Sequence, residues 1–88
     1  MNNEKLEAAS HALFEAFKKG LNSFMERKGL SNRRLGELIG VSHMSISFWR
    51  NGTHEPKMRD VEALARAGMT IVELFGEDTA SKLMTNVI

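Results

Sequence analysis

Basic and hydrogen-bonding side chains gather in the middle of this 88-residue chain. Residues 21–59 hold seven Lys or Arg and three Glu, whereas residues 60–88 hold two Lys or Arg and five Asp or Glu. A basic middle beside an acidic end indicates that one face meets an anionic partner. The formal net charge is only +1, and chance clustering of charges on a solvated surface is the alternative interpretation.

The side chains that could catalyse a reaction or bind a metal form no recognisable motif. Ser, His and Asp all occur, but there is no nucleophile elbow, no paired-carboxylate motif and no phosphate-binding loop. The chain has no cysteine, and His11 and His54 have no ligand-like companions in the sequence, so no metal site is predicted. We therefore expect a protein that is not an enzyme and needs no cofactor.

The elements that position these side chains are predicted to be helices. Apolar residues recur every three or four positions, and no stretch alternates as a strand does. Helices are expected over residues 6–28, 32–39, 43–51, 58–67 and 71–75, with a further one over 79–88. Gly20 leaves open whether the first is one helix or two, and in the fourth we expect Val61, Leu64 and Ala65 to be buried. The sequence thus predicts one all-α domain with a modest core.

The pattern of residues 32–51 predicts two short helices joined by a turn of three or four residues that contains Gly40. Leu35, Ile46 and Trp49 are expected in the core, which argues against Trp49 as a stacking platform for single-stranded nucleic acid. The outward positions of the second helix are His43, Met44, Ser47 and Phe48. This pattern is typical of a helix-turn-helix, whose second helix enters the major groove of DNA.

Residues 30–42 (LSNRRLGELIGVS), followed by Ser45-Ile46-Ser47 and Asn51-Gly52, resemble the lambda-repressor and Cro (XRE-type) family of DNA-binding proteins. The resemblance extends from about Leu21 to Phe75. It implies a compact bundle of about five helices that usually works as a homodimer on a two-fold-related operator, in prokaryotic or phage regulators.

The chain departs from the family pattern close to the helix-turn-helix. Asn32 stands where the family usually has Gln, and Gly36 where it usually has Ala. Met25 and Arg50 stand where many members carry an Arg–Glu pair. Because both members of that pair have changed, we do not expect a lone buried charge at this place.

The resemblance implies phosphate contacts at helix N-termini and in the loop after the second helix. The matching and flanking residues are Ser31, Asn32, Arg33, Arg34, Ser45, Asn51 and Lys57. Base contacts are expected from the exposed start of the second helix, at Ser42, His43, Met44, Ser47 and Phe48. His43 can donate to guanine, and Met44 and Phe48 suit thymine methyl groups, so we expect a half-site that contains thymine. Phe48 could instead fold back against the core, and the basic residues of the phosphate set could be ordinary solvated charges.

We expect three regions: an N-terminal helical extension (1–20), a DNA-binding domain (21–76) and an amphipathic C-terminal tail (77–88). The apolar faces of the two ends need a partner, and residues 6–17 with 83–88 are expected to form or complete a homodimer surface. The alternatives are packing within one chain, packing on another protein, or a chain that is the N-terminal part of a longer repressor.

We therefore expect a cytoplasmic, nucleoid-associated regulator that binds double-stranded DNA and represses transcription as a homodimer. No apolar run is long enough to predict a membrane span, and the first residues do not resemble a signal peptide. Two alternatives stay open. One is an antitoxin-type regulator that also binds a toxin protein, and the other is a protein-interaction module on the same scaffold.

Overall fold

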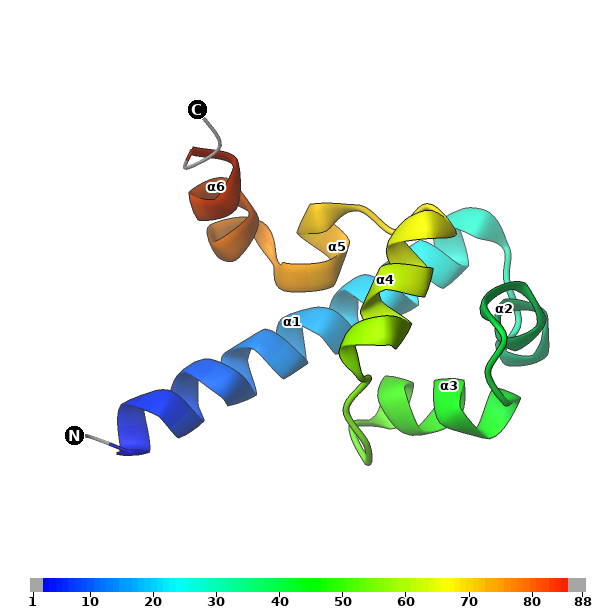
Figure 1. The fold of residues 1–88 in the computed structure, drawn as a ribbon, viewed down its shortest axis with the longest axis horizontal. Helices are drawn as coiled ribbons and strands as arrows, with labels where there is room; N and C mark the ends of the chain where they lie inside the picture. The colour runs from blue at the N-terminus through cyan, green and yellow to red at the C-terminus, as the bar shows by residue number, and fades with distance from the viewer. Residues whose placement is uncertain (1–2, 86–88) are drawn as a thin grey trace.

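The structure, a computed structural model, describes the backbone of residues 3–85 and the side chains of residues 11–85. Six helices and no strand occur within residues 3–85, which confirms the all-α prediction (Figure 1). They are α1 (Asn3–Lys28), α2 (Asn32–Ile39), α3 (His43–Asn51), α4 (Met58–Arg66), α5 (Ile71–Phe75) and α6 (Glu77–Thr85). Over the same range, no helix combines the length and the hydropathy that a membrane crossing needs.

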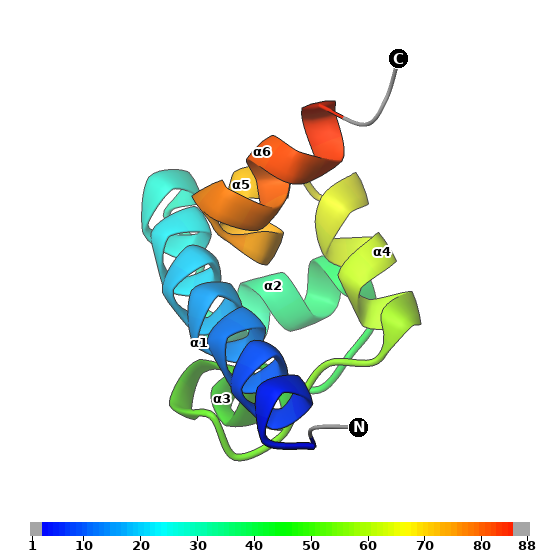
Figure 2. The same cartoon turned by 90° about the vertical axis from the view of Figure 1, so that its left-hand side faces the viewer.

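The long helix α1 is the support on which the other helices assemble. Both α5 and α3 pack directly against it. Figure 1 shows α5 and α6 above α1 and α3 below it, and Figure 2 shows the same arrangement from the N-terminal end of α1. α1 continues through Gly20 as a single helix, so the first predicted segment is one helix rather than two.

Gly20 allows α5 to approach α1 closely. A Cβ added at Gly20 would lie 1.7 Å from the carbonyl oxygen of Glu73 and 2.4 Å from its carbonyl carbon. Both atoms belong to the backbone of α5, which cannot move aside cheaply, so only glycine fits at this crossing. A glycine that costs α1 about 1 kcal/mol of helix propensity is therefore required by the packing of α5.

The core lies between α1 and the helices that follow it. Its largest fully buried side chains are Phe24, Leu21, Met25, Leu35, Ile46 and Leu64. Each contributes about 1.5–3 kcal/mol through the removal of apolar surface from water. Burial of Leu35, Ile46 and Trp49 confirms the inward faces predicted for α2 and α3.

On α4 the predicted inward face is partly wrong. Leu64 is buried and Val61 is half-buried, as expected, but Ala65 is exposed. The reason is the rotation of the helix, because α4 turns Val61 and Leu64 toward the core, and Ala65 lies about 100° away from Leu64 around the axis.

α6 begins at Glu77, two residues before the predicted segment. Its inner face contributes Ala80, which is buried against the rest of the molecule. Leu83 and Met84 remain 44 % and 60 % exposed. Val87 and Ile88, which were expected on the same face, lie outside the described residues.

The expected dimer surface on α1 is wrong at Phe17, which is buried in the core. Phe14 is half-buried and stacks on Phe17, with 6.4 Å between the ring centroids. Leu13, by contrast, is 41 % exposed. The aromatic side chains of this segment therefore stabilise the monomer, and Leu13 is the large apolar residue that α1 leaves open between residues 11 and 17.

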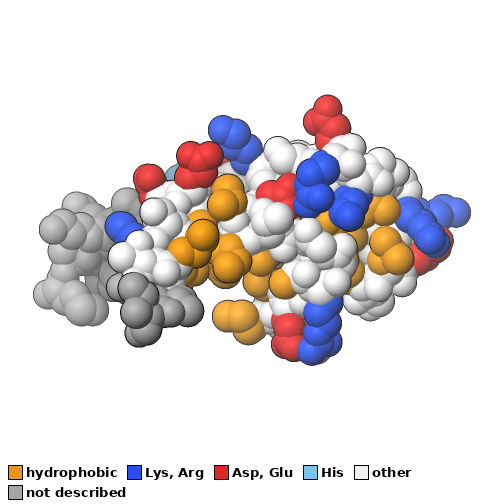
Figure 3. Space-filling model, turned by 90° about the horizontal axis from the view of Figure 1, so that it is seen from above, with side chains coloured by type: hydrophobic (Ala, Val, Ile, Leu, Met, Phe, Trp, Pro, Cys, Tyr) orange, Lys and Arg blue, Asp and Glu red, His pale blue; other side chains and the backbone are white. Residues whose placement is uncertain are grey.

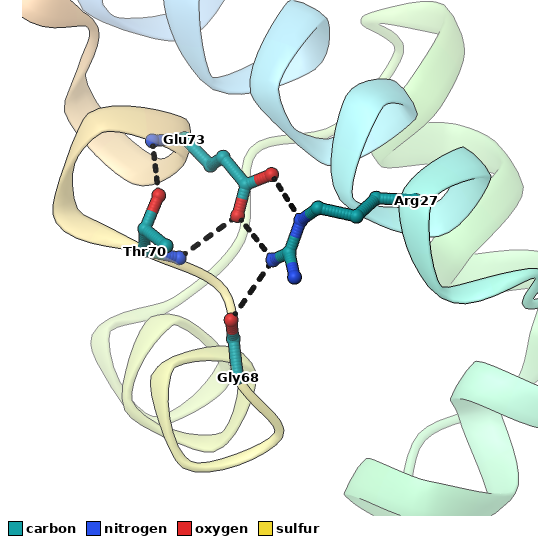
Figure 4. Close-up of polar contacts among 4 residues, drawn as sticks. All are labelled: Arg27, Gly68, Thr70 and Glu73. Carbon is teal, nitrogen blue, oxygen red and sulfur yellow. Dashed lines mark hydrogen bonds and ion pairs between the residues drawn. The ribbon is translucent and has the colours of Figure 1, made fainter.

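An ion pair that the sequence analysis did not foresee ties α1 to α5 (Figure 4). Arg27 donates from Nη2 to Glu73 Oε1 at 2.8 Å and from Nε to Oε2 at 3.2 Å, and Nη2 also reaches the carbonyl oxygen of Gly68 at 3.1 Å. The same carboxylate accepts from the N–H of Thr70 and so caps α5. The hydrogen bonds from Arg27 hold the pKa of Glu73 below its usual range.

Candidate nucleic-acid interface

Two helices of the chain begin with an exposed serine that caps them. Ser31 Oγ accepts from the N–H of Arg34 at 3.0 Å, and Ser42 Oγ accepts from the N–H of Ser45 at 3.2 Å. The half-buried Ser45 also places its hydroxyl 3.1 Å from that of Ser42. Neither α2 nor α3 has an acidic residue in its first turn. Because a helix N-terminus is positive and its first N–H groups lack helical partners, both ends suit an anion such as phosphate.

Two glycines shape the turn between α2 and α3. Gly40 ends α2 with φ 76°, in the left-handed region that glycine adopts without strain. A Cβ at Gly36 would lie 2.6 Å from the carbonyl oxygen of Val41. Glycine is therefore the residue that lets the turn lie this close to α2 without a shift of the backbone.

α3 has a buried face and an open face. Ile46 and Trp49 are buried and anchor the helix. On the other side, His43 is exposed, Met44 is 50 % exposed and Ser47 is half-buried. The N-terminal half of α3 thus presents an imidazole, a thioether and a hydroxyl to solvent while the opposite face is held in the core.

Phe48 is half-buried and contacts a residue from outside the helix-turn-helix. Its ring lies against His54 in the α3–α4 loop, with 4.6 Å between centroids and 56° between the ring planes. From the sequence alone, His54 is notable only as a possible metal ligand. Among the described residues, no three His, Cys, Asp or Glu side chains come together as a metal site would require. In the structure His54 packs against Phe48 on α3.

The two arginines at the start of α2 differ in their partners. Arg33 is exposed, and no carboxylate among residues 11–85 pairs with it. Arg34 Nη1 lies 3.3 Å from Glu37 Oε2, and both side chains are exposed. An exposed pair contributes about 0–1 kcal/mol, so Arg34 could exchange Glu37 for another anion at small cost.

The remaining candidates lie at the two ends of the α3–α4 loop, because Asn51 is the last residue of α3 and Lys57 directly precedes α4. Asn51 Oδ1 accepts from the N–H of Thr53 at 3.0 Å and from the Thr53 hydroxyl. Lys57 is exposed, and its backbone N–H donates to Asp60 Oδ2 at 2.8 Å, which fixes the start of α4. The backbone of Lys57 is therefore held at the start of α4, and its side chain is exposed to solvent.

Asn32 is held by an arginine that the site predictions did not include. Arg50, in the last turn of α3, donates from Nη1 to Asn32 Oδ1 at 2.6 Å and from Nε to Asn22 Oδ1 at 2.7 Å. Asn22 in turn donates from Nδ2 to the carbonyl oxygen of Lys18 at 2.9 Å. Met25, which stands at the other position of the family's Arg–Glu pair, is buried in the core. Arg50 thus hydrogen-bonds to two amide side chains, and its guanidinium connects α1, α2 and α3.

Comparison with known proteins agrees with this geometry. A helix-turn-helix family model matches residues 21–68, which is more than half of the chain and includes α2, the turn and α3. Comparisons with curated proteins and with solved structures give no match.

Proposed function

Because this chain belongs to the helix-turn-helix family of DNA-binding regulators, of the XRE type, we propose that it is a sequence-specific repressor that binds its operator as a homodimer. The observation that carries the proposal is the open face of α3, whose opposite face is buried through Ile46 and Trp49. A recognition helix needs this combination, because its outer side chains must enter the major groove while its inner face holds it on the domain.

Base contacts are assigned to the exposed start of α3. Ser42 and His43 supply hydrogen-bonding groups, Met44 supplies an apolar contact for a thymine methyl group, and Ser47 follows one turn later. Phe48 lies at the edge of this set, because one side of its ring is occupied by His54.

Phosphate contacts are assigned to the residues that surround the reading helix. These are Ser31, Asn32, Arg33, Arg34, Ser45, Asn51 and Lys57. The support is the absence of acidic residues from the first turns of α2 and α3, together with the exposed cationic side chains of this set. Contacts of this kind supply most of the affinity for DNA and little of the sequence preference.

The proposal of a homodimer follows from the size of the reading helix and from the apolar surface at the chain ends. α3 has nine residues and reaches few base pairs. Two half-sites about 34 Å apart supply the missing contacts. A groove of about 810 Å³ lies between α1 and the α5–α6 region, lined in part by Leu13 and Val72. Exposed Leu83 and Met84 add apolar surface on α6. Figure 3, which views the molecule of Figure 1 from above, shows hydrophobic side chains at the surface of that face.

Selection from randomised duplexes, followed by measurement of Kd for selected and scrambled sequences, tests this function. We expect enrichment of a two-fold-related site and a preference over scrambled DNA of at least about 10³-fold at physiological salt. Equal affinity for every duplex would contradict sequence-specific binding, and enrichment of a single half-site would contradict the dimer.

A protein-interaction module is the alternative that the exposed apolar residues favour, and an antitoxin-type regulator would combine both activities. Binding to duplex DNA at about 50 mM salt separates the two functions, because even non-specific DNA-binding proteins hold DNA at low salt. The absence of binding under these conditions would favour the protein-interaction module, whereas measurable binding supports the regulator.

A further inference from the structure

We propose that Arg50 is a positioning residue for DNA phosphate that acts by orienting the side-chain amide of Asn32. The inference rests on the proposed function, because it assigns a role within the DNA-binding surface. It concerns a residue that belongs to neither set of proposed DNA contacts and that lies in the last turn of α3.

The orientation of Asn32 follows from the hydrogen-bonding groups involved. A guanidinium has only donors, so an amide that faces it must present its oxygen. Arg50 Nη1 lies 2.6 Å from Asn32 Oδ1. The Nδ2 group of Asn32, which carries two donors, is therefore turned away from Arg50. No acceptor among the described residues takes a hydrogen bond from Nδ2.

Arg50 is itself held in place, so the orientation is rigid. Its Nε donates to Asn22 Oδ1 at 2.7 Å, and the Asn22 amide is fixed by its own hydrogen bond to the Lys18 carbonyl. The planar guanidinium therefore cannot rotate without breaking two hydrogen bonds at once. A chain of three oriented groups runs from α1 through the end of α3 to the first residue of α2.

The location of the Asn32 Nδ2 group indicates a DNA phosphate as its hydrogen-bond acceptor. Asn32 is the first residue of α2, directly after the cap Ser31, and the first turn of α2 has no acidic residue. Arg50 has no carboxylate partner among residues 11–85, so its charge is not neutralised within the described part of the molecule. A cation bound to the amide oxygen polarises the amide and makes its N–H groups better donors.

A purely structural role for Arg50 makes a different prediction. If Arg50 only joined three helices, its loss would lower stability and leave the contribution of Asn32 to DNA binding unchanged. A positioning role instead couples the two residues in binding, which a double-mutant cycle measures directly.

The experiment is a cycle of Asn32→Ala and Arg50→Met in the full chain, read by fluorescence anisotropy with a labelled duplex under conditions where circular dichroism shows all variants folded. In the wild-type background we expect Asn32→Ala to weaken binding about threefold to tenfold, the value of one hydrogen bond. In the Arg50→Met background the same change is expected to have almost no further effect. An equal loss in both backgrounds would overturn the proposal.

Two controls separate positioning from charge. Arg66→Met removes the same charge from the exposed face of α4, and in that background Asn32→Ala should keep its full effect. The dependence of log Kd on log salt should have the same slope for Arg50→Met as for the wild type. A slope reduced by about one unit would mean that Arg50 itself contacts phosphate, and would overturn the positioning role.

Arg50→Gln takes the place of Arg50→Met if that variant does not fold. A glutamine has a single uncharged amide and cannot hold Asn22 and Asn32 together as the guanidinium does, so the effect of Asn32→Ala is again expected to shrink, and an unchanged effect contradicts the proposal. A wild-type chain that binds no duplex at low salt contradicts the proposed function itself, which distinguishes that failure from failure of the coupling.

Discussion

Single side chains on the proposed DNA surface have separable physical roles. Met44 is a half-exposed apolar residue that cannot donate a hydrogen bond, and Lys57 is an exposed cation on an ordered loop. An apolar contact with a base changes sequence preference, whereas a phosphate contact changes affinity for all sequences alike. A substitution of Met44 is therefore expected to change base preference, and a substitution of Lys57 to change affinity for all sequences.

Met44→Ala is expected to change the preference at one base-pair position by about 1–3 kcal/mol. The sharpest measurement compares Kd for duplexes with thymine and with uracil at that position, which differ by one methyl group. Wild type should distinguish them and Met44→Ala should not. Met58→Ala, at an exposed methionine of α4, is the matched control and should retain the distinction.

Lys57→Ala is expected to weaken all duplexes alike and to lower the slope of log Kd against log salt by about one unit. Titrations of one specific and one scrambled duplex over a range of salt concentrations measure both effects. Lys82→Ala on α6 serves as the control and should leave the slope unchanged. A change of base preference in Lys57→Ala would contradict its assignment to the phosphate set.

Residues whose roles depend on neighbours in sequence could be predicted, and residues with distant partners could not. Ser31 and Ser42 each cap a helix through an N–H three residues away, and a serine directly before a helix is a local signal for such a cap. Arg50 meets Asn22 across 28 positions, so no local pattern indicates the contact. The only signal in the sequence that Arg50 has a different partner is the departure from the family's Arg–Glu pair at Met25 and Arg50.

At the scale of elements, the crossing of α1 and α5 depends on the glycine in the middle of α1. In an exposed helix Gly→Ala stabilises by about 1 kcal/mol, because alanine has the higher helix propensity. At Gly20 the added Cβ would collide with the backbone of Glu73. At this crossing Gly→Ala is therefore expected to destabilise the fold, although it stabilises an ordinary exposed helix.

Gly20→Ala is expected to destabilise the fold by about 1–3 kcal/mol or more, as overpacking of a tight contact does. Urea unfolding followed by circular dichroism measures the change. Ser23→Ala, at an exposed position one turn further along α1, should be neutral or slightly stabilising. A Gly20→Ala variant more stable than the wild type would show that α5 does not pack here.

The Arg27–Glu73 pair predicts an acid-sensitive connection between the same two helices. The pKa of Glu73 is lowered in the folded state, chiefly by the hydrogen bonds from Arg27. Its stabilising contribution is therefore complete above the ordinary glutamate pKa of about 4.3, and is lost as the pH falls through the lowered folded-state value. Glu73→Gln and Arg27→Met should each flatten the acid side of a plot of unfolding free energy against pH. If both variants kept the wild-type dependence of unfolding free energy on pH below about pH 4.3, the prediction would be wrong.

At the scale of the whole molecule, one compact domain presents two different surfaces. The open face of α3 and the starts of α2 and α3 form the proposed DNA surface, while α6 and the groove beside α1 expose apolar side chains. The helices and their order could be predicted because apolar periodicity is local. The closeness of α1 and α5 could not, because it depends on contacts such as Arg27–Glu73 across 46 positions.

The apolar surface of α6 gives a prediction for the assembly. If it contributes to the proposed dimer, Leu83→Lys with Met84→Lys should raise the dimer dissociation constant at least about tenfold, because two apolar contacts are replaced by charges. Sedimentation equilibrium measures this constant. Ser81→Lys on the same helix is the control for added charge. An unchanged dimer would place the interface elsewhere.

The most direct measurement of the proposed DNA surface is a titration of the ¹⁵N-labelled chain with a selected duplex, followed by amide chemical shifts. The predicted result is that the largest changes occur at the start of α3, over residues 42–48, and at the start of α2, over residues 31–34, with small changes in α6. Largest changes on α6 or in the groove beside α1, with α3 unaffected, would contradict a DNA surface built on α3.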